Sequence, residues 1–298
     1  MAAVKIDASR ELLAALRQYV EGCEASGKLR PAIFAHFPGG ALNGTDGVFP
    51  FTPDSDRGLA VLLFAAALYR PGGEALAARI LAGLYRRYDA GIFKLNRQPF
   101  EPLRDAIEDL APRLDAEERD RIPGILRSVC DFFYRVGPLG PWLASAPDWE
   151  MRVGELCNEI YWMGARSRAR TKARWFLWLA CQAPGFGARH PQALGFDWPA
   201  GEGHMRFLFD IVRPPYGFKV PAPEERPAAF STLARAAFPD SPWRLRAPLE
   251  AFLDRKGMGF ACRAAQGGCL PCALAPHCPA SARFIAEGDL PLEHGANE

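Results

Sequence analysis

Four cysteines near the end of the chain form the pattern with the clearest chemical potential. Cys262, Cys269, Cys272 and Cys278 follow the spacing C-x6-C-x2-C-x5-C, within a stretch rich in glycine and proline. Loop residues can bring such thiolates to one centre, and all-thiolate sites suit zinc or an iron–sulfur cluster. A disulfide framework is the alternative, and a reducing compartment argues against it.

The other four cysteines are scattered along apolar helical positions. They are Cys23, Cys130, Cys157 and Cys181. Because a free cysteine packs as a small hydrophobic residue, we expect these four to be buried structural residues.

A basic segment lies in the middle of the chain. Residues 164–174, GARSRARTKAR, contain Arg166, Arg168, Arg170, Lys172 and Arg174 and no acidic residue. A helix N-terminus favours acidic side chains, so a basic one is best explained by an external anion that contacts both the amides and the arginines. The sequence therefore predicts phosphate binding here, with a solvated helix start as the alternative.

The cysteine spacing carries a family resemblance. Together with the preceding KGMGFAC (residues 256–262), it resembles the four-cysteine loop of endonuclease III and adenine glycosylases, a branch of the helix-hairpin-helix DNA glycosylases. The resemblance implies a [4Fe–4S] cluster on the four cysteines and a fold of two helical domains. It also implies double-stranded DNA as the partner, with a damaged base flipped into a cleft. Judged from the cysteines alone, zinc stays open.

The same resemblance suggests catalytic residues. Lys172, in RTKARWFLWLA, resembles the lysine that follows the family's hairpin, and the K-x3-F pattern to Phe176 is similar to that of archaeal 8-oxoguanine glycosylases. Such a lysine attacks the sugar C1′ as a free amine and forms a Schiff base. Neighbouring cations disfavour its charged form and so make the amine more available.

A carboxylate should support loss of the base. PAGEGHMRFLFDIV resembles the family's Asp-x-His stretch, which places Glu202 where Asp is expected and His204 at the histidine position. Asp197 and Asp210 are the alternative carboxylates. We expect His204 and the four arginines to contact DNA, and Phe196 and Trp198 to line the base pocket, because aromatic rings stack on a flipped base. Most other tryptophans should belong to the core.

The sequence predicts that the elements that position these residues are helices. They are expected near residues 9–24, 56–70, 73–88, 102–112, 116–136, 149–163, 170–182, 203–212, 227–237 and 243–256. Ser9 should cap the first of them, and Asp54 or Ser55 the second, which is apolar nearly all round and therefore predicted to be buried. Pro123 should interrupt the helix at 116–136, and residues 183–201 should form a long loop.

No segment shows sustained period-2 alternation, so the prediction is an all-α fold. We expect a helical barrel domain at residues 55–165. The second helical domain would comprise residues 1–54 and 166–298, with the cluster loop at 262–278.

Composition narrows the classes of function. The chain has 298 residues, 49% hydrophobic and 23% charged, with a net charge of +2, so it is globular and not polybasic overall. The longest apolar run, residues 58–69, is shorter than the roughly 20 residues that a membrane span needs. The first residues lack the apolar core of a secretory signal. We expect a monomer in the cytoplasm, associated with the nucleoid if the source is bacterial, and no membrane partner.

The prediction for function is a base-excision repair glycosylase with abasic-site lyase activity through Lys172. The alternatives are a catalytically inactive iron–sulfur relative that binds DNA, and a metal-holding protein whose likeness ends at the cysteine loop.

Overall fold

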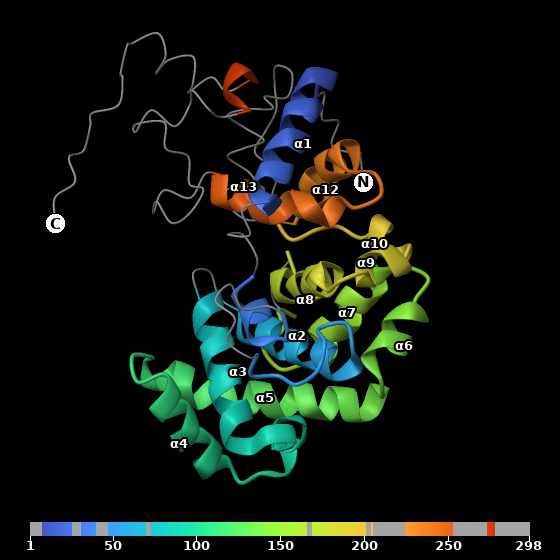
Figure 1. Ribbon diagram of the computed structural model, residues 1–298. Coiled ribbons are helices and arrows are strands. Elements are labelled where there is room, and N and C mark those ends of the chain that lie inside the picture. Colours follow the sequence, from blue (N-terminus) through green and yellow to red (C-terminus); the bar gives the residue numbers. More distant parts are fainter. Residues whose placement is uncertain are drawn as a thin grey trace, which may run out of the picture. The chain divides into compact units, whose positions relative to one another are not determined.

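A computed structural model of the protein describes residues 8–25, 31–39, 47–69, 73–165, 169–200, 204, 224–252 and 273–277 (Figure 1). Within these ranges the ordered elements are helices and none is a strand, so the predicted all-α class is confirmed for this part of the chain. No helix in the described ranges is long and apolar enough to cross a membrane.

The chain divides into two compact units. The central unit is Arg30–Phe196, and the terminal unit combines Met1–Leu29 with Asp197–Glu298. The central unit contains η1 (Ala32–His36), α2 (Asp56–Leu68), α3 (Glu74–Tyr88), η2 (Asp89–Arg97), α4 (Phe100–Leu110), α5 (Ala116–Val136), α6 (Leu139–Ala144), α7 (Trp149–Glu159), α8 (Thr171–Gln182), α9 (Phe186–Arg189) and α10 (Gln192–Gly195). The terminal unit contains α1 (Arg10–Ala25), α12 (Arg226–Ala237), η4 (Pro242–Leu245), α13 (Arg246–Phe252) and η6 (Ala275–His277).

Helix α2 is the core element of the central unit. The Ser55 hydroxyl accepts a hydrogen bond of 3.1 Å from the Gly58 amide, so Ser55 is the N-cap out of the two predicted candidates, Asp54 and Ser55. All ten residues from Gly58 to Ala67 are buried, because α2 packs against α8, α5, α3 and α6. A helix that is apolar on every side requires such all-round packing.

The prediction that Pro123 interrupts the helix at 116–136 is wrong. Helix α5 runs without a break from Ala116 to Val136 and contains Pro123. Proline removes one backbone donor and disfavours a straight helix. The helix persists because residues on both sides of Pro123, including Ile122, Ile125 and Leu126, are buried in the core on one stripe. Tertiary packing therefore outweighs the local penalty.

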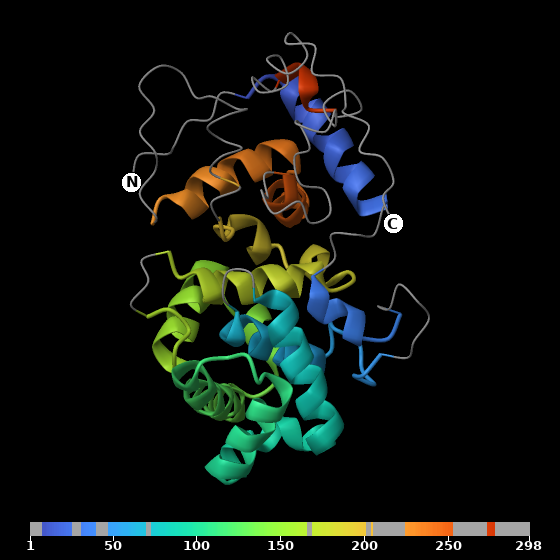
Figure 2. The same cartoon turned by 90° about the vertical axis from the view of Figure 1, so that its left-hand side faces the viewer.

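The terminal unit is built around α1 and α12, which lie beside each other in both views (Figures 1 and 2). The Ser9 hydroxyl accepts a 3.1 Å hydrogen bond from the Leu12 amide, as predicted for the N-cap of α1. The buried stripe of this helix includes Leu12 and Leu16. Arg17 Nε donates to the Ala237 carbonyl over 2.6 Å and ties α1 to the end of α12.

The stretch 183–201 is more ordered than predicted. The expected long loop contains two single-turn helices, α9 and α10, within the central unit. Helix α9 packs on α8 and α10 packs on α7. Burial of Phe186 and Ala193 in these contacts holds the short turns in place, although neither segment has a strong helical pattern of its own.

Candidate DNA-contact turn between α7 and α8

The basic segment lies in the turn that joins α7 to α8. Helix α7 ends at Glu159, earlier than the predicted Met163, and the turn is described at residues 160–165 and 169–170. Three of these residues have a positive φ: Trp162 at 66°, Gly164 at 109° and Arg170 at 48°. For a bulky non-glycine residue this conformation costs about 1 kcal/mol, so the surrounding contacts must hold it.

Two aromatic side chains of this turn face solvent. Tyr161 is 50% exposed and Trp162 is 47% exposed, whereas most tryptophans were expected in the core. The guanidinium of Arg121, on α5, lies 4.4 Å from the centre of the Trp162 ring, which is a cation–π arrangement. The Tyr161 amide donates to the Ser128 hydroxyl over 3.1 Å. Contacts with α5 thus fix the turn and present its aromatic surface.

Arg174 ties α8 to α7 from inside the unit. Its side chain is buried, and its two terminal nitrogens lie 2.8 and 2.5 Å from the two carboxylate oxygens of Glu150. Its Nε donates to the Ala169 carbonyl over 3.2 Å. This bidentate geometry places the guanidinium within the hairpin formed by α7 and α8, and its predicted contact with DNA stays a prediction.

Arg170 has a different environment although it lies only four residues earlier. It is exposed, it precedes the first residue of α8, and it forms no ion pair with a residue that the structure describes. One guanidinium nitrogen lies over Gly154 of α7. Arg170, Arg121, Tyr161 and Trp162 together are called the α7–α8 turn surface.

Lys172, the predicted nucleophile, is the second residue of α8. Its Nζ donates a 2.6 Å hydrogen bond to the carbonyl of Ala67, in the last turn of α2. A cation at a helix C-terminus satisfies a terminal carbonyl and interacts favourably with the helix dipole. The lysine therefore has a structural contact in the described protein, and its catalytic role stays a prediction.

The predicted base-pocket and histidine residues are buried. Phe196 packs against Trp149 and under the Arg174 guanidinium in the central unit. Trp198 packs against Trp243 in the terminal unit, where its amide donates to the Ser231 hydroxyl over 2.6 Å.

His204 has Nε2 2.9 Å from the Arg246 carbonyl, and its ring contacts Phe230. Phe196, Trp198 and His204 are all buried, and their roles in contacting DNA or a flipped base stay predictions.

Several predicted site residues lie outside the described ranges. They are Arg166, Arg168, Glu202, Cys262, Cys269, Cys272 and Cys278. In the ranges that are described, no three His, Cys, Asp or Glu side chains come together to form a metal site.

The remaining cysteines, Cys23, Cys130, Cys157 and Cys181, are buried, as predicted. Burial raises the pKa of the Cys130 thiol to about 12 and the pKa of Cys181 well above its ordinary value, which keeps both neutral.

No protein-family model matches the chain, and no curated protein and no solved structure matches it.

The aromatic part of the turn surface was missed in the sequence, although a signal was present. Tyr161 and Trp162 lie just before Gly164 and the basic run, and glycine favours the end of a helix.

Replacing Arg174 by methionine should destabilise the protein. The change keeps much of the side-chain volume but removes the charge-assisted hydrogen bonds to Glu150, so we expect the free energy of unfolding to fall by about 2 kcal/mol. Urea unfolding followed by far-ultraviolet circular dichroism measures this. Arg170→Met is the matched control, because an exposed arginine should change stability by less than about 0.5 kcal/mol. Equal urea midpoints of unfolding for the two variants would show that the Arg174–Glu150 pair does not stabilise the protein.

Proposed function

We propose that this protein is an iron–sulfur DNA repair glycosylase that removes a damaged base from duplex DNA. The observation that carries the proposal is the C-x6-C-x2-C-x5-C spacing of Cys262, Cys269, Cys272 and Cys278, with its resemblance to the cluster loop of the endonuclease III branch. Four thiolates are a complete ligand set for a [4Fe–4S] cluster. When bound, the cluster would cross-link the loop that carries its ligands.

The α7–α8 turn surface supports DNA as the partner. It combines two exposed aromatic rings with the cations Arg121 and Arg170. Aromatic side chains stack on bases that have lost their pairing partners, and arginines bind phosphate oxygens. The turn follows α7 and leads directly into the helix that starts with Thr171 and Lys172. A helix, a basic turn and a second helix is the order expected of a DNA-contacting hairpin.

The proposed reaction uses residues of this chain. The neutral amine of Lys172 attacks C1′ of the damaged nucleotide, and the bond between C1′ and the base breaks with its electron pair leaving on the base. The nitrogen, positively charged after the attack, gives one proton to the departing base. Its lone pair then forms the double bond to C1′ as the bond between C1′ and O4′ breaks, and O4′ takes a proton from water, which leaves a protonated Schiff base between Lys172 and C1′. A carboxylate, for which Glu202 is the proposed residue, stabilises the positive charge that develops on the sugar.

One observation favours a second candidate, a catalytically inactive iron–sulfur relative that binds DNA. Glu202 occupies the position where the family has Asp, and its longer side chain moves the carboxylate by about one C–C bond. Such a protein would keep the cluster and the α7–α8 turn surface and bind DNA without turnover.

Base release from a panel of duplexes, each with one oxidised, deaminated or mismatched base, tests the proposed activity. Trp162→Ala should weaken binding to the preferred duplex about tenfold, because one stacked ring is lost. Fluorescence anisotropy of a labelled duplex measures this affinity.

Tyr134→Ala is the matched control for Trp162→Ala, since Tyr134 is 76% exposed on α5 but lies outside the turn surface. Equal affinities for the two variants would exclude stacking by the turn. Binding without base release from any duplex would favour the inactive relative. Absence of both would overturn the proposal.

A further inference from the structure

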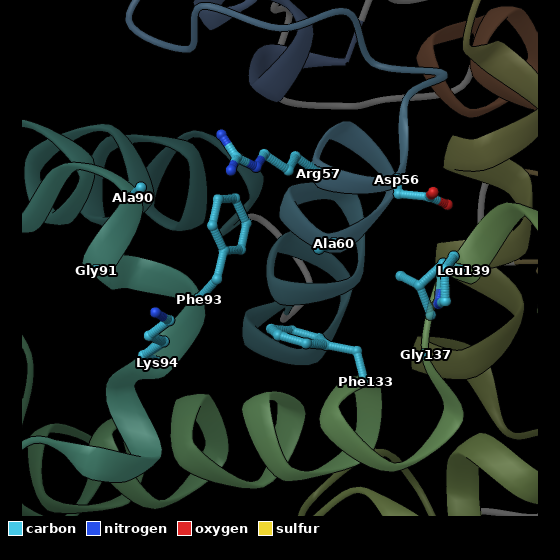
Figure 3. Close-up of a pocket in the computed structure, with 11 residues that line it drawn as sticks. Asp56, Arg57, Ala60, Ala90, Gly91, Phe93, Lys94, Phe133, Gly137 and Leu139 are labelled. Carbon is cyan, nitrogen blue, oxygen red and sulfur yellow. The ribbon is translucent and has the colours of Figure 1, made fainter.

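A pocket in the central unit lies apart from the α7–α8 turn surface. It has a volume of about 370 Å³ and is formed by the start of α2, by η2, by the end of α5 and by the turn into α6 (Figure 3). This volume is in the range of pockets that take small organic ligands. Every wall belongs to the same compact unit, so the pocket is complete within residues 30–196.

The floor of the pocket is apolar and partly aromatic. The rings of Phe93 and Phe133 line it with their centres 6.3 Å apart and their planes inclined by 67°. Ala60 of α2, Pro138 and Leu139 complete the apolar wall. Both phenylalanine side chains are only partly buried, so each leaves ring surface facing the pocket. A flat apolar or aromatic group would cover this surface and remove it from water.

The rim carries an excess of positive charge. Arg57 and Lys94 are exposed lining residues, and neither forms an ion pair or hydrogen bond with any residue in the described ranges. Figure 3 shows the Phe93 ring between these two side chains. The single acidic lining residue, Asp56, points away from Arg57 and accepts a 2.9 Å hydrogen bond from the Gly140 amide. Two cations beside an aromatic floor fit an anionic head attached to a ring.

We infer that this pocket binds a small amphipathic anion, with a planar ring system on Phe93 and Phe133 and a phosphate or carboxylate held at the rim by Arg57 and Lys94. The inference is independent of the proposed function. The pocket lies at the first two turns of α2, whereas Lys172 contacts Ala67 in the last turn, about 10 to 16 Å away along the helix axis. Occupation of the pocket therefore involves none of the residues proposed to contact DNA.

Isothermal titration of the purified full-length protein with 2-naphthyl phosphate tests the inference. We expect saturable binding to one site per chain. 2-Naphthoate should also bind, whereas 2-naphthol, which lacks the anion, and inorganic phosphate, which lacks the ring, should each bind at least about tenfold more weakly. Affinity for the neutral ring equal to that for both anions would overturn the assignment, as would the absence of saturable binding.

Variants locate the binding. Arg57→Gln combined with Lys94→Gln should weaken 2-naphthyl phosphate binding about tenfold, since two partly solvated cations are lost. Ala90→Trp, on the η2 wall, should block the pocket and abolish binding.

Arg113→Gln, an exposed arginine outside the pocket, is the control and should bind as the native protein does. Circular dichroism confirms that each variant is folded. Unchanged binding in both the double variant and Ala90→Trp would place the ligand elsewhere and exclude this site.

Discussion

Borohydride treatment of the protein mixed with an abasic-site duplex should trap a covalent protein–DNA adduct, and Lys172→Arg should abolish it. Reduction converts a Schiff base into a stable amine, so only a residue that attacks as a primary amine gives an adduct. A guanidinium is always protonated and cannot do so. We expect the rate of adduct formation to fall by about 1,000-fold or more, as when a catalytic nucleophile is removed. Gel electrophoresis of the reduced mixture measures it.

The choice of arginine separates chemistry from structure. Lys172 Nζ donates to the Ala67 carbonyl at the end of α2, and an arginine keeps a cation and donors at this position. Lys172→Ala removes both and should also lower the free energy of unfolding by about 1 kcal/mol. Lys94→Arg is the matched control, because it changes another lysine of the same unit that has no proposed part in the reaction.

Retention of the adduct in Lys172→Arg would show that another amine is the nucleophile. Base release without any adduct in the native protein would indicate a glycosylase that uses water instead of a lysine.

Replacing Cys269 and Cys272 together by serine should remove the metal centre. A [4Fe–4S] cluster needs four thiolates, and two serines leave only half of the ligand set. Iron analysis of the native protein purified without oxygen should give about four iron atoms per chain, with an equal amount of acid-labile sulfide. The double variant should retain less than about one iron atom. Because bound metal stabilises the state that binds it, the variant should also unfold at a lower temperature.

The control for the cysteine pair is Cys23→Ala. Cys23 is buried on α1 and is not one of the four predicted ligands, so its replacement tests the loss of a cysteine without the loss of a ligand. It should keep its full metal content. One zinc ion per native chain, without sulfide, would replace the cluster by a zinc site. A native protein with no metal would contradict both assignments and remove the main support for the proposed function.

Local signals in the sequence predicted the helices well. Ser9 was predicted as one N-cap and Asp54 or Ser55 as the next, and the hydroxyls of Ser9 and Ser55 accept the expected amide hydrogen bonds. The apolar segment at 56–70 was predicted to be buried, and residues 58–67 of α2 are buried on every side of the helix. These predictions succeeded because capping and the helical period depend on residues within about one turn of each other.

The errors arose where packing overrode local preference. Pro123 does not break α5, since the buried stripe around it keeps the helix intact. The helix that was expected to run to residue 163 ends at Glu159, so Trp162 lies in the turn that follows, with its ring half exposed beside Arg121. Arg121 is far away in the sequence, so no local pattern predicts the contact.

The sequence by itself determined the all-α class, the capped helices and the spacing of four cysteines that can ligate a metal, because each depends on neighbours along the chain. Only the tertiary structure decided which cations face solvent. Arg170 and Arg174 belong to one basic run, but Arg174 is buried and hydrogen-bonded to Glu150, whereas Arg170 is exposed.

The pocket likewise exists only in the folded chain, where residues 56–60, 90–94 and 133–139 come together. A set of contacts between distant segments depends on how helices pack, and packing is a property of the folded chain as a whole.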